Sequence, residues 1–145
     1  MVEINMLANN VNNTKKQVWK DDTTFDSVGI VIDDSTFDTG TGIDRDYDVR
    51  GFDGVSVLLS NSGANAIDVV ILGATKDFAM NAMDATLVDA DFTEVLLTEE
   101  EVASGASATA LDLLRTTPKI TAIRIRAKEA VAANPGVLKG NVKAF

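Results

Sequence analysis

Apolar and polar residues alternate along residues 52–76, a two-residue period typical of β-strands with one face on a hydrophobic core. The alternation runs in two stretches, separated by the polar segment 60–65 (SNSGAN). Gly, Asn and Ser accept or stabilise the backbone conformations that turns require. The pattern therefore predicts two strands joined by a tight polar turn. Their inward-facing residues are expected to be Val55, Val57, Leu59, Ile67, Val69 and Ile71.

Similar alternation predicts further short strands on both sides of this pair. Residues 44–50 are expected to begin a strand that Phe52 continues. About seven to nine short strands with Gly, Asn and Asp turns are typical of sandwiches and jelly rolls. The remaining strands are expected near residues 17–19, 28–32, 92–97, 108–114, 120–128 and 137–145.

Three connections carry local signals of their own. Residues 76–91 fit a long excursion with a helical turn over one end of the sandwich. The capping-box pattern from Thr98 to Glu101 predicts one helical turn, which ends at Gly105. Asn134-Pro135-Gly136 predicts a turn, because Pro fixes φ and Gly accepts a positive φ.

The 145 residues are enough for one domain. We expect an all-β, single-domain β-sandwich of the jelly-roll kind with an extended N-terminal arm. Residues 1–27 are predicted to form the arm, because they are rich in Asn and lack a long apolar period, and residues 28–145 the sandwich domain. Trp19 is expected either to plug the edge of the core or to dock on a neighbouring subunit.

The composition removes much of the usual chemistry of enzymes. The chain contains no Cys and no His, which excludes thiolate nucleophiles, Cys-based metal sites and a Ser-His-Asp triad. We expect no enzyme activity and no cofactor. The net charge of −9 opposes binding to nucleic acid or to an anionic membrane. A signal-like N-terminus and a bilayer-spanning apolar run are both missing, so synthesis in the cytoplasm is expected.

Two groups of carboxylates suggest chemistry that their surroundings do not support. Asp44, Asp46, Asp48 and Asp53 are spaced like the start of a calcium-binding loop. Val49 replaces the required Gly, so we expect a solvated strand face and no metal site. The neighbouring acids at residues 33–34 and 99–101 could serve a carboxylate hydrolase, but they are expected to be exposed surface.

Three basic residues line one face of the strand predicted at residues 120–128. Arg124, Arg126 and Lys128 are three of the 13 Lys and Arg in this acidic chain. One interpretation is cross-strand pairing with Asp or Glu on neighbouring strands. The other is a basic surface that meets an acidic face of another copy or of a scaffold protein.

Two segments resemble virion structural proteins of tailed bacteriophages, most closely small capsid decoration proteins. They are GVSVLLSNSGANAIDVVILGA (residues 54–74) and ITAIRIRAKEAVAANPGVLKGNVKAF (residues 120–145), the second of which resembles a closing hairpin. The resemblance implies a compact β-domain without catalytic side chains, assembled as a homotrimer on the capsid exterior. Its implied partners are further copies of itself and the major capsid protein.

We therefore expect a non-enzymatic virion protein that binds and stabilises the outer shell. The residues expected in self-association or shell contact are Val11, Lys15, Lys16, Val18, Trp19, Arg124, Arg126 and Lys128. The alternative is a carbohydrate- or receptor-binding module of a phage tail or cell surface. That alternative predicts exposed aromatic side chains near loops, for which the candidates are Phe37, Tyr47, Phe52 and Phe78.

Overall fold

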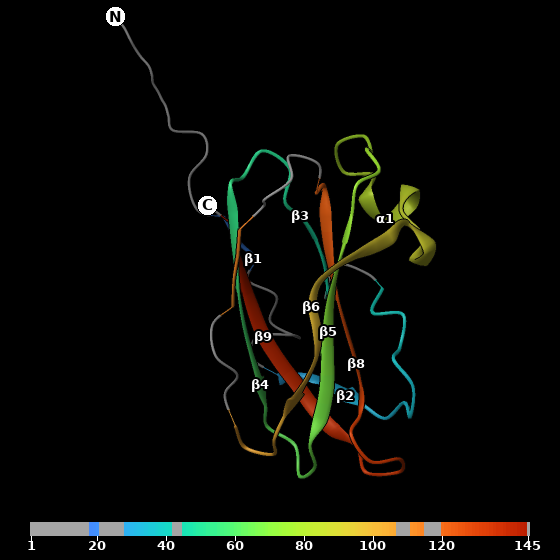
Figure 1. Ribbon diagram of the computed structural model, residues 1–145, viewed down its shortest axis with the longest axis vertical. Coiled ribbons are helices and arrows are strands. Elements are labelled where there is room, and N and C mark those ends of the chain that lie inside the picture. Colours follow the sequence, from blue (N-terminus) through green and yellow to red (C-terminus); the bar gives the residue numbers. More distant parts are fainter. Residues whose placement is uncertain (1–17, 21–27, 42–44, 107–110, 115–119, 145) are drawn as a thin grey trace, which may run out of the picture.

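Two antiparallel β-sheets make up almost all of the regular structure in a computed structural model of the chain (Figure 1). The structure describes residues 18–20, 28–41, 45–106, 111–114 and 120–144. Helical structure within these residues is limited to α1 (Met83–Thr86) and a single 3₁₀ turn, η2 (Asp89–Asp91). The prediction of an all-β fold is confirmed.

The first sheet, sheet A, has five strands. Its order is β1-β9-β4-β7, and β2 pairs with β9 further along the edge that also holds β1. The second sheet, sheet B, has four strands in the order β3-β8-β5-β6. Sheet A consists of β1 (Val18–Lys20), β2 (Ile30–Ile32), β4 (Gly54–Asn61), β7 (Leu111–Leu114) and β9 (Gly136–Ala144). Sheet B consists of β3 (Asp46–Asp48), β5 (Ile67–Ala74), β6 (Phe92–Val102) and β8 (Ala122–Glu129).

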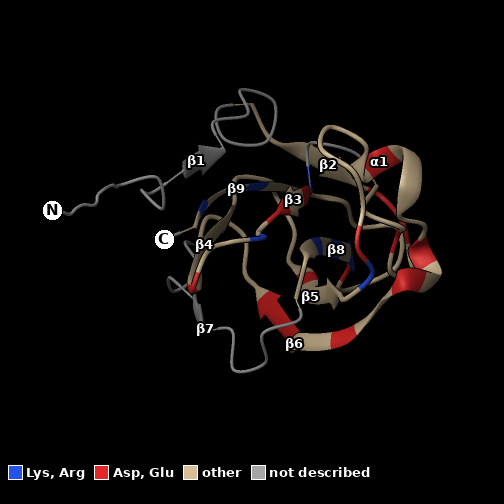
Figure 2. Cartoon of the chain, turned by 90° about the horizontal axis from the view of Figure 1, so that it is seen from above, with Lys and Arg blue, Asp and Glu red and all other residues tan. Residues whose placement is uncertain are grey.

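The inward-facing residues of both sheets belong to one hydrophobic core. The alternating positions predicted for β4 and β5 are all buried there, together with Ile123 and Ile125 of β8 and Leu138 of β9. Seen from above, β4 and β9 lie on one side of the molecule and β5 and β8 on the other (Figure 2). The period of two thus identified the core correctly, because strand side chains alternate strictly between faces.

The expected pairing of neighbouring strands is wrong in three places. β4 and β5 do not form a hairpin, since β4 pairs with β7 and β9 whereas β5 pairs with β6 and β8. β8 and β9 likewise lie in different sheets, so residues 120–145 do not form a closing hairpin. Residues 46–48 also belong to sheet B, separately from the strand that starts at Gly54. Two strands joined by a short turn show the same alternation whether they pair in one sheet or lie in two facing sheets. The alternation therefore does not predict which strands pair.

The capping box from Thr98 to Glu101 forms no helical turn. β6 instead continues to Val102, with Glu101 opposite Asp68 and Val102 opposite Ile67. Thr98 and the three glutamates are exposed on this edge strand. The backbone bonds of the ladder with β5 thus prevail over a local cap, which satisfies few backbone groups.

A loop substitutes for a strand along the open half of β8. The Asp38 amide donates to the Ala127 carbonyl at 3.2 Å, and the Glu129 amide donates to the Asp34 carbonyl at 2.7 Å. Gly40 lets this loop approach β8 closely, because a Cβ at Gly40 would collide with the Ile125 carbonyl. Gly40 also has φ +57°, which disfavours other residues. The loop at residues 33–41 is therefore closely packed against sheet B.

The excursion at residues 75–91 builds a small second core. Phe78, Met83 and Leu87 are buried in it against Ala74 of β5, Phe92 of β6 and Ala122 of β8. The expected helical turn is present as α1. The apolar residues of this excursion therefore cover part of sheet B outside the main core.

The turn before β9 differs from the one predicted at residues 134–136. The residue with a positive φ is Ala133 (φ 69°), and Gly136 is already the first residue of β9. Gly136 is needed for space, because a Cβ there would contact Ile67 and the Asn65 carbonyl. The Asn134 amide donates to the Val131 carbonyl at 3.1 Å, so the chain turns at residues 131–134.

Ala133→Gly is expected to raise the free energy of unfolding by about 0.5 to 1 kcal/mol. Left-handed backbone costs a residue with a Cβ about 1–2 kcal/mol, and the larger unfolded-state entropy of Gly offsets part of this gain. Denaturant unfolding of the variant measures the change. The matched control is Ala132→Gly in the same turn, where φ is not positive and the substitution is expected to destabilise slightly. Equal effects of the two changes would contradict the assignment of strain to Ala133.

Candidate functional site

Charged residues of β8, β3 and η2 meet on the outer face of sheet B, around Arg124 of β8. Arg124 lies opposite Asp46 of β3 in the strand register, and their side chains form a bidentate ion pair with both N–O distances at 2.8 Å. Both side chains are only 3% exposed. The Arg124 guanidinium also donates to Asp89 at 3.2 Å and stacks 4.1 Å from the ring centroid of Phe92.

The electrostatics of this pair favour a permanently charged arginine. Burial by itself lowers the pKa of Arg124, but hydrogen bonds and charge from Asp46, and then from Asp89, outweigh it and raise the pKa above its usual value. A raised folded-state pKa means that the stabilisation is fully present below the unfolded value. It is lost only as the pH rises through the raised value, so ordinary alkaline buffers leave the pair intact.

The other two basic residues of the stripe are also paired within the chain. Arg126 donates to Asp89, and Lys128 lies 3.1 Å from Asp68 and 3.8 Å from Glu99. Pairing with acids on neighbouring strands thus describes the contacts of Arg124 with Asp46 and of Lys128 with Asp68, whereas Arg126 pairs with Asp89 of the 3₁₀ turn η2. Arg124 keeps almost no surface for another molecule, whereas Arg126 and Lys128 remain about one fifth exposed. Their part in self-association stays a prediction.

The residues predicted in the arm are described only in part. Val11, Lys15 and Lys16 lie outside the described residues, as do the side chains of Val18 and Trp19. The backbone of β1 is described, and it places Val18 opposite Ala144 and Trp19 opposite Lys143 on the edge of sheet A. The short strand predicted near residues 17–19 is therefore present, and it pairs with β9.

The acidic residues considered for calcium have different surroundings from one another. Asp46 is buried against Arg124, which corrects the expectation that it is solvated. Asp48 forms a bidentate pair with Arg50 instead, while Asp53 is exposed and Asp44 lies outside the described residues. Among the described residues, no group of three or more acidic side chains could hold a metal ion.

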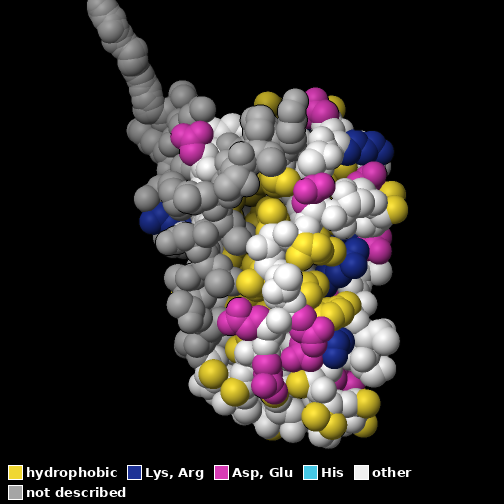
Figure 3. Space-filling view, viewed as in Figure 1, with side chains coloured by type: hydrophobic (Ala, Val, Ile, Leu, Met, Phe, Trp, Pro, Cys, Tyr) yellow, Lys and Arg dark blue, Asp and Glu magenta, His cyan; other side chains and the backbone are white. Residues whose placement is uncertain are grey.

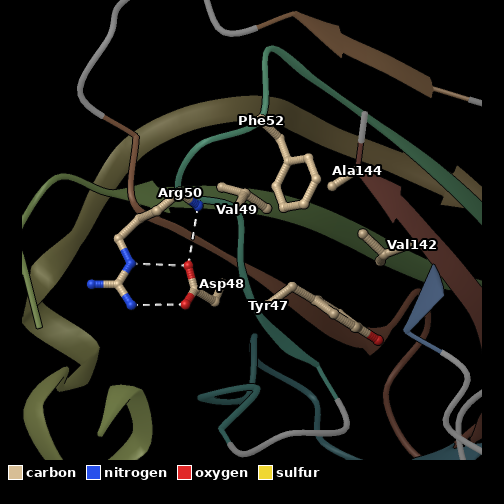
Figure 4. Close-up of a pocket in the computed structure, with 7 residues that line it drawn as sticks. All are labelled: Tyr47, Asp48, Val49, Arg50, Phe52, Val142 and Ala144. Atoms are coloured by element: carbon tan, nitrogen blue, oxygen red, sulfur yellow. Dashed lines mark hydrogen bonds and ion pairs between the residues drawn. The ribbon is translucent and has the colours of Figure 1, made fainter. Parts of the chain in front are cut away.

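An apolar cavity of about 250 Å³ opens beside the loop between β3 and β4 (Figure 4). Phe52 projects between Val49 and Ala144, and Val142 of β9 lines the same hollow. At the rim, Arg50 is tied to Asp48 and Asp77 and stacks 3.6 Å from the centroid of Phe78. Hydrogen bonds to Asp48, reinforced by Asp77, raise the pKa of Arg50 despite the opposing effect of burial. Sequence reasoning missed this cavity because its walls come from segments about 90 residues apart.

The chain matches no protein-family model, no curated protein and no solved structure. None of the helices in the described segments is long and apolar enough to cross a membrane.

Two of the four aromatic side chains considered for ligand binding are buried. Tyr47 is 2% exposed in the main core, and Phe78 is 6% exposed beneath Arg50. Phe37 and Phe52 are half-buried, and Lys128 lies 5.4 Å from the ring centroid of Phe37. Of these four, Tyr47 and Phe52 line the cavity, and Phe52 is the more exposed of the two.

Proposed function

We propose that this chain is a non-enzymatic virion structural protein of a tailed bacteriophage, a capsid decoration protein that stabilises the outer shell. In this proposal the two sheets form a jelly-roll-like sandwich, and the protein acts as a homotrimer on the major capsid protein. The supporting observation is the outer face of sheet B, where Arg124, Arg126 and Lys128 are held by Asp46, Asp68 and Asp89. Such internal pairing suits a rigid body that presents fixed surfaces to its neighbours.

The arm supplies the proposed attachment. β1 pairs with β9 through three register pairs at the edge of sheet A. Val11, Lys15, Lys16, Val18 and Trp19 would contact the shell or a neighbouring subunit. Repeated weak contacts of this kind give a long residence time once several arms of one trimer bind together.

Removal of the Trp19 side chain tests this role of the arm. We expect the wild-type chain to sediment with emptied capsids from a panel of tailed phages, and Trp19→Ala to lose at least about tenfold in capsid affinity, since large aromatic side chains often dominate interfaces. The control is Met80→Ala, which removes an exposed apolar side chain from the excursion at residues 75–91. If the wild-type chain binds none of the capsids, the proposed function is wrong.

The cavity beside Phe52 favours a second candidate function, a carbohydrate- or receptor-binding module. Binding sites are usually concave and largely apolar with a few polar groups at the edge, and this cavity has Phe52, Val142 and the Arg50–Asp48 pair. Binding of the wild-type chain to a glycan array, with loss on Phe52→Ala, would support this candidate over capsid decoration.

A further inference from the structure

The outer face of sheet A carries exposed apolar side chains on both sides of Lys139. Val31 of β2 lies opposite Val137 of β9, and a side chain at Gly29 would collide with Val137 and Lys139. Val28 therefore belongs to the same part of the surface. Leu58 of β4 lies opposite Asn141, which makes it a diagonal neighbour of Lys139. We call Val28, Val31, Leu58, Val137 and Lys139 the valine patch.

The valine patch differs sharply from the outer face of sheet B. Val28, Val31 and Leu58 are 71%, 62% and 43% exposed, and they are three of seven large hydrophobic side chains exposed in the described residues. Lys139 forms no ion pair with any described residue, whereas the basic residues of β8 are all paired. Clustered apolar side chains on a polar surface mark a site of protein–protein contact. The outer face of sheet A is therefore the better candidate for such a contact than the outer face of sheet B.

The partner of this patch should combine an apolar side chain with unpaired carboxylates. The edge strand β6 of the same chain has both, because Val95 is 61% exposed and Glu94, Glu100 and Glu101 are exposed without an ion pair to any described residue. The register places Val95 and Glu101 on the outer face of sheet B and Glu94 and Glu100 on the other face of the same edge. Figure 3 shows acidic side chains gathered over the lower part of β6, with hydrophobic side chains among them. The two surfaces of one molecule are complementary in charge and polarity.

We propose that the valine patch of one copy docks on the β6 edge of a second copy. The register shifts between β5 and β6 make β6 irregular, which disfavours backbone pairing across the edge and leaves the contact to side chains. A contact between two different surfaces of identical chains propagates head to tail and closes into a ring if the rotation allows. The inference rests on the proposed function, whose trimer such a ring would form.

Charge exchange tests the contact. We expect Lys139→Glu and the double variant Glu94→Lys/Glu100→Lys each to weaken self-association at least about tenfold, because like charges then face one another. The triple variant with all three changes reverses the charge on both surfaces and is expected to regain association. Light scattering and sedimentation measure these masses. The matched control is Asp84→Lys, which reverses an exposed acid on α1 and should leave association unchanged.

Several outcomes would overturn this contact. A wild-type chain that stays monomeric at every concentration, a Lys139→Glu variant with the wild-type mass, or a triple variant that stays dissociated would each do so. Thermal unfolding of every variant checks that the fold is intact. Capsid sedimentation is a separate readout: a wild-type oligomer that binds no capsid overturns the proposed function and leaves this contact standing.

Discussion

Arg124→Ala is expected to lower the free energy of unfolding by about 3 to 5 kcal/mol, the usual cost of removing one partner of a buried ion pair. The substitution leaves the Asp46 carboxylate buried, because both side chains are 3% exposed in the folded chain. It also removes one of the two arginine contacts of Asp89, the other being Arg126, and thereby weakens one attachment of the excursion at residues 75–91. Denaturant unfolding of the purified variant measures the loss.

Two further variants separate charge from packing. Arg126→Ala is the matched control, because Arg126 also forms an ion pair with Asp89 but its side chain is 18% exposed. This substitution is expected to lower the free energy of unfolding by less than about 1 kcal/mol. The double variant Arg124→Met/Asp46→Leu removes both charges, and it should recover most of the stability, since apolar replacement of a buried pair is often neutral. Wild-type stability in Arg124→Ala would show that this pair does not hold β3 on β8.

Asn61→Ala is expected to destabilise the chain by at least about 3 kcal/mol. Asn61 is 1% exposed at the end of β4, and its side chain makes four hydrogen bonds. Its amide nitrogen donates to the Asn65 carbonyl at 2.7 Å and the Val102 carbonyl at 3.1 Å. Its amide oxygen accepts from the Gly63 amide at 2.9 Å and the Val137 amide at 3.1 Å. Each buried backbone group that the substitution leaves without a hydrogen bond costs about 1–3 kcal/mol. Two of these groups, the Val102 carbonyl and the Val137 amide, belong to β6 and β9.

Asn65→Ala in the same turn is the control for Asn61. Asn65 is half-buried and its side chain makes one recorded hydrogen bond, to the Pro135 carbonyl at 2.9 Å. Loss of that bond is expected to cost about 1 kcal/mol or less. Thermal or denaturant unfolding compares the two variants. Similar losses in both would mean that the network around Asn61 does not join the two sheets.

The sequence predicted which residues face the core, because this depends on the local two-residue period. It did not predict which strands are neighbours in a sheet. Alternation along β4, β5 and β8 identified the core residues, because a side chain's face follows from its position in the strand. Which strands pair is a property of the whole fold, so the sheet change after Asn61 could not be seen in the turn itself. The polar turn residues were still informative, since Asn61 organises that crossing.

The candidate sites show the same division. The stripe on β8 was visible in the sequence, but its partner Asp46 lies 78 residues away and was expected to be solvated. The valine patch comes from three strands distant in the sequence, and its members were expected only as ordinary strand residues. Surfaces built across strands become visible only when the register is known.

The solution mass of the purified chain, measured by light scattering over a range of concentrations and salt, tests the central claim most directly. A virion protein that assembles through repeated subunit contacts should give a species near three times the monomer mass. We expect that species to dissociate more readily at high salt, because the valine patch and the β6 edge carry opposite charges. A monomer at every concentration and salt would contradict the account.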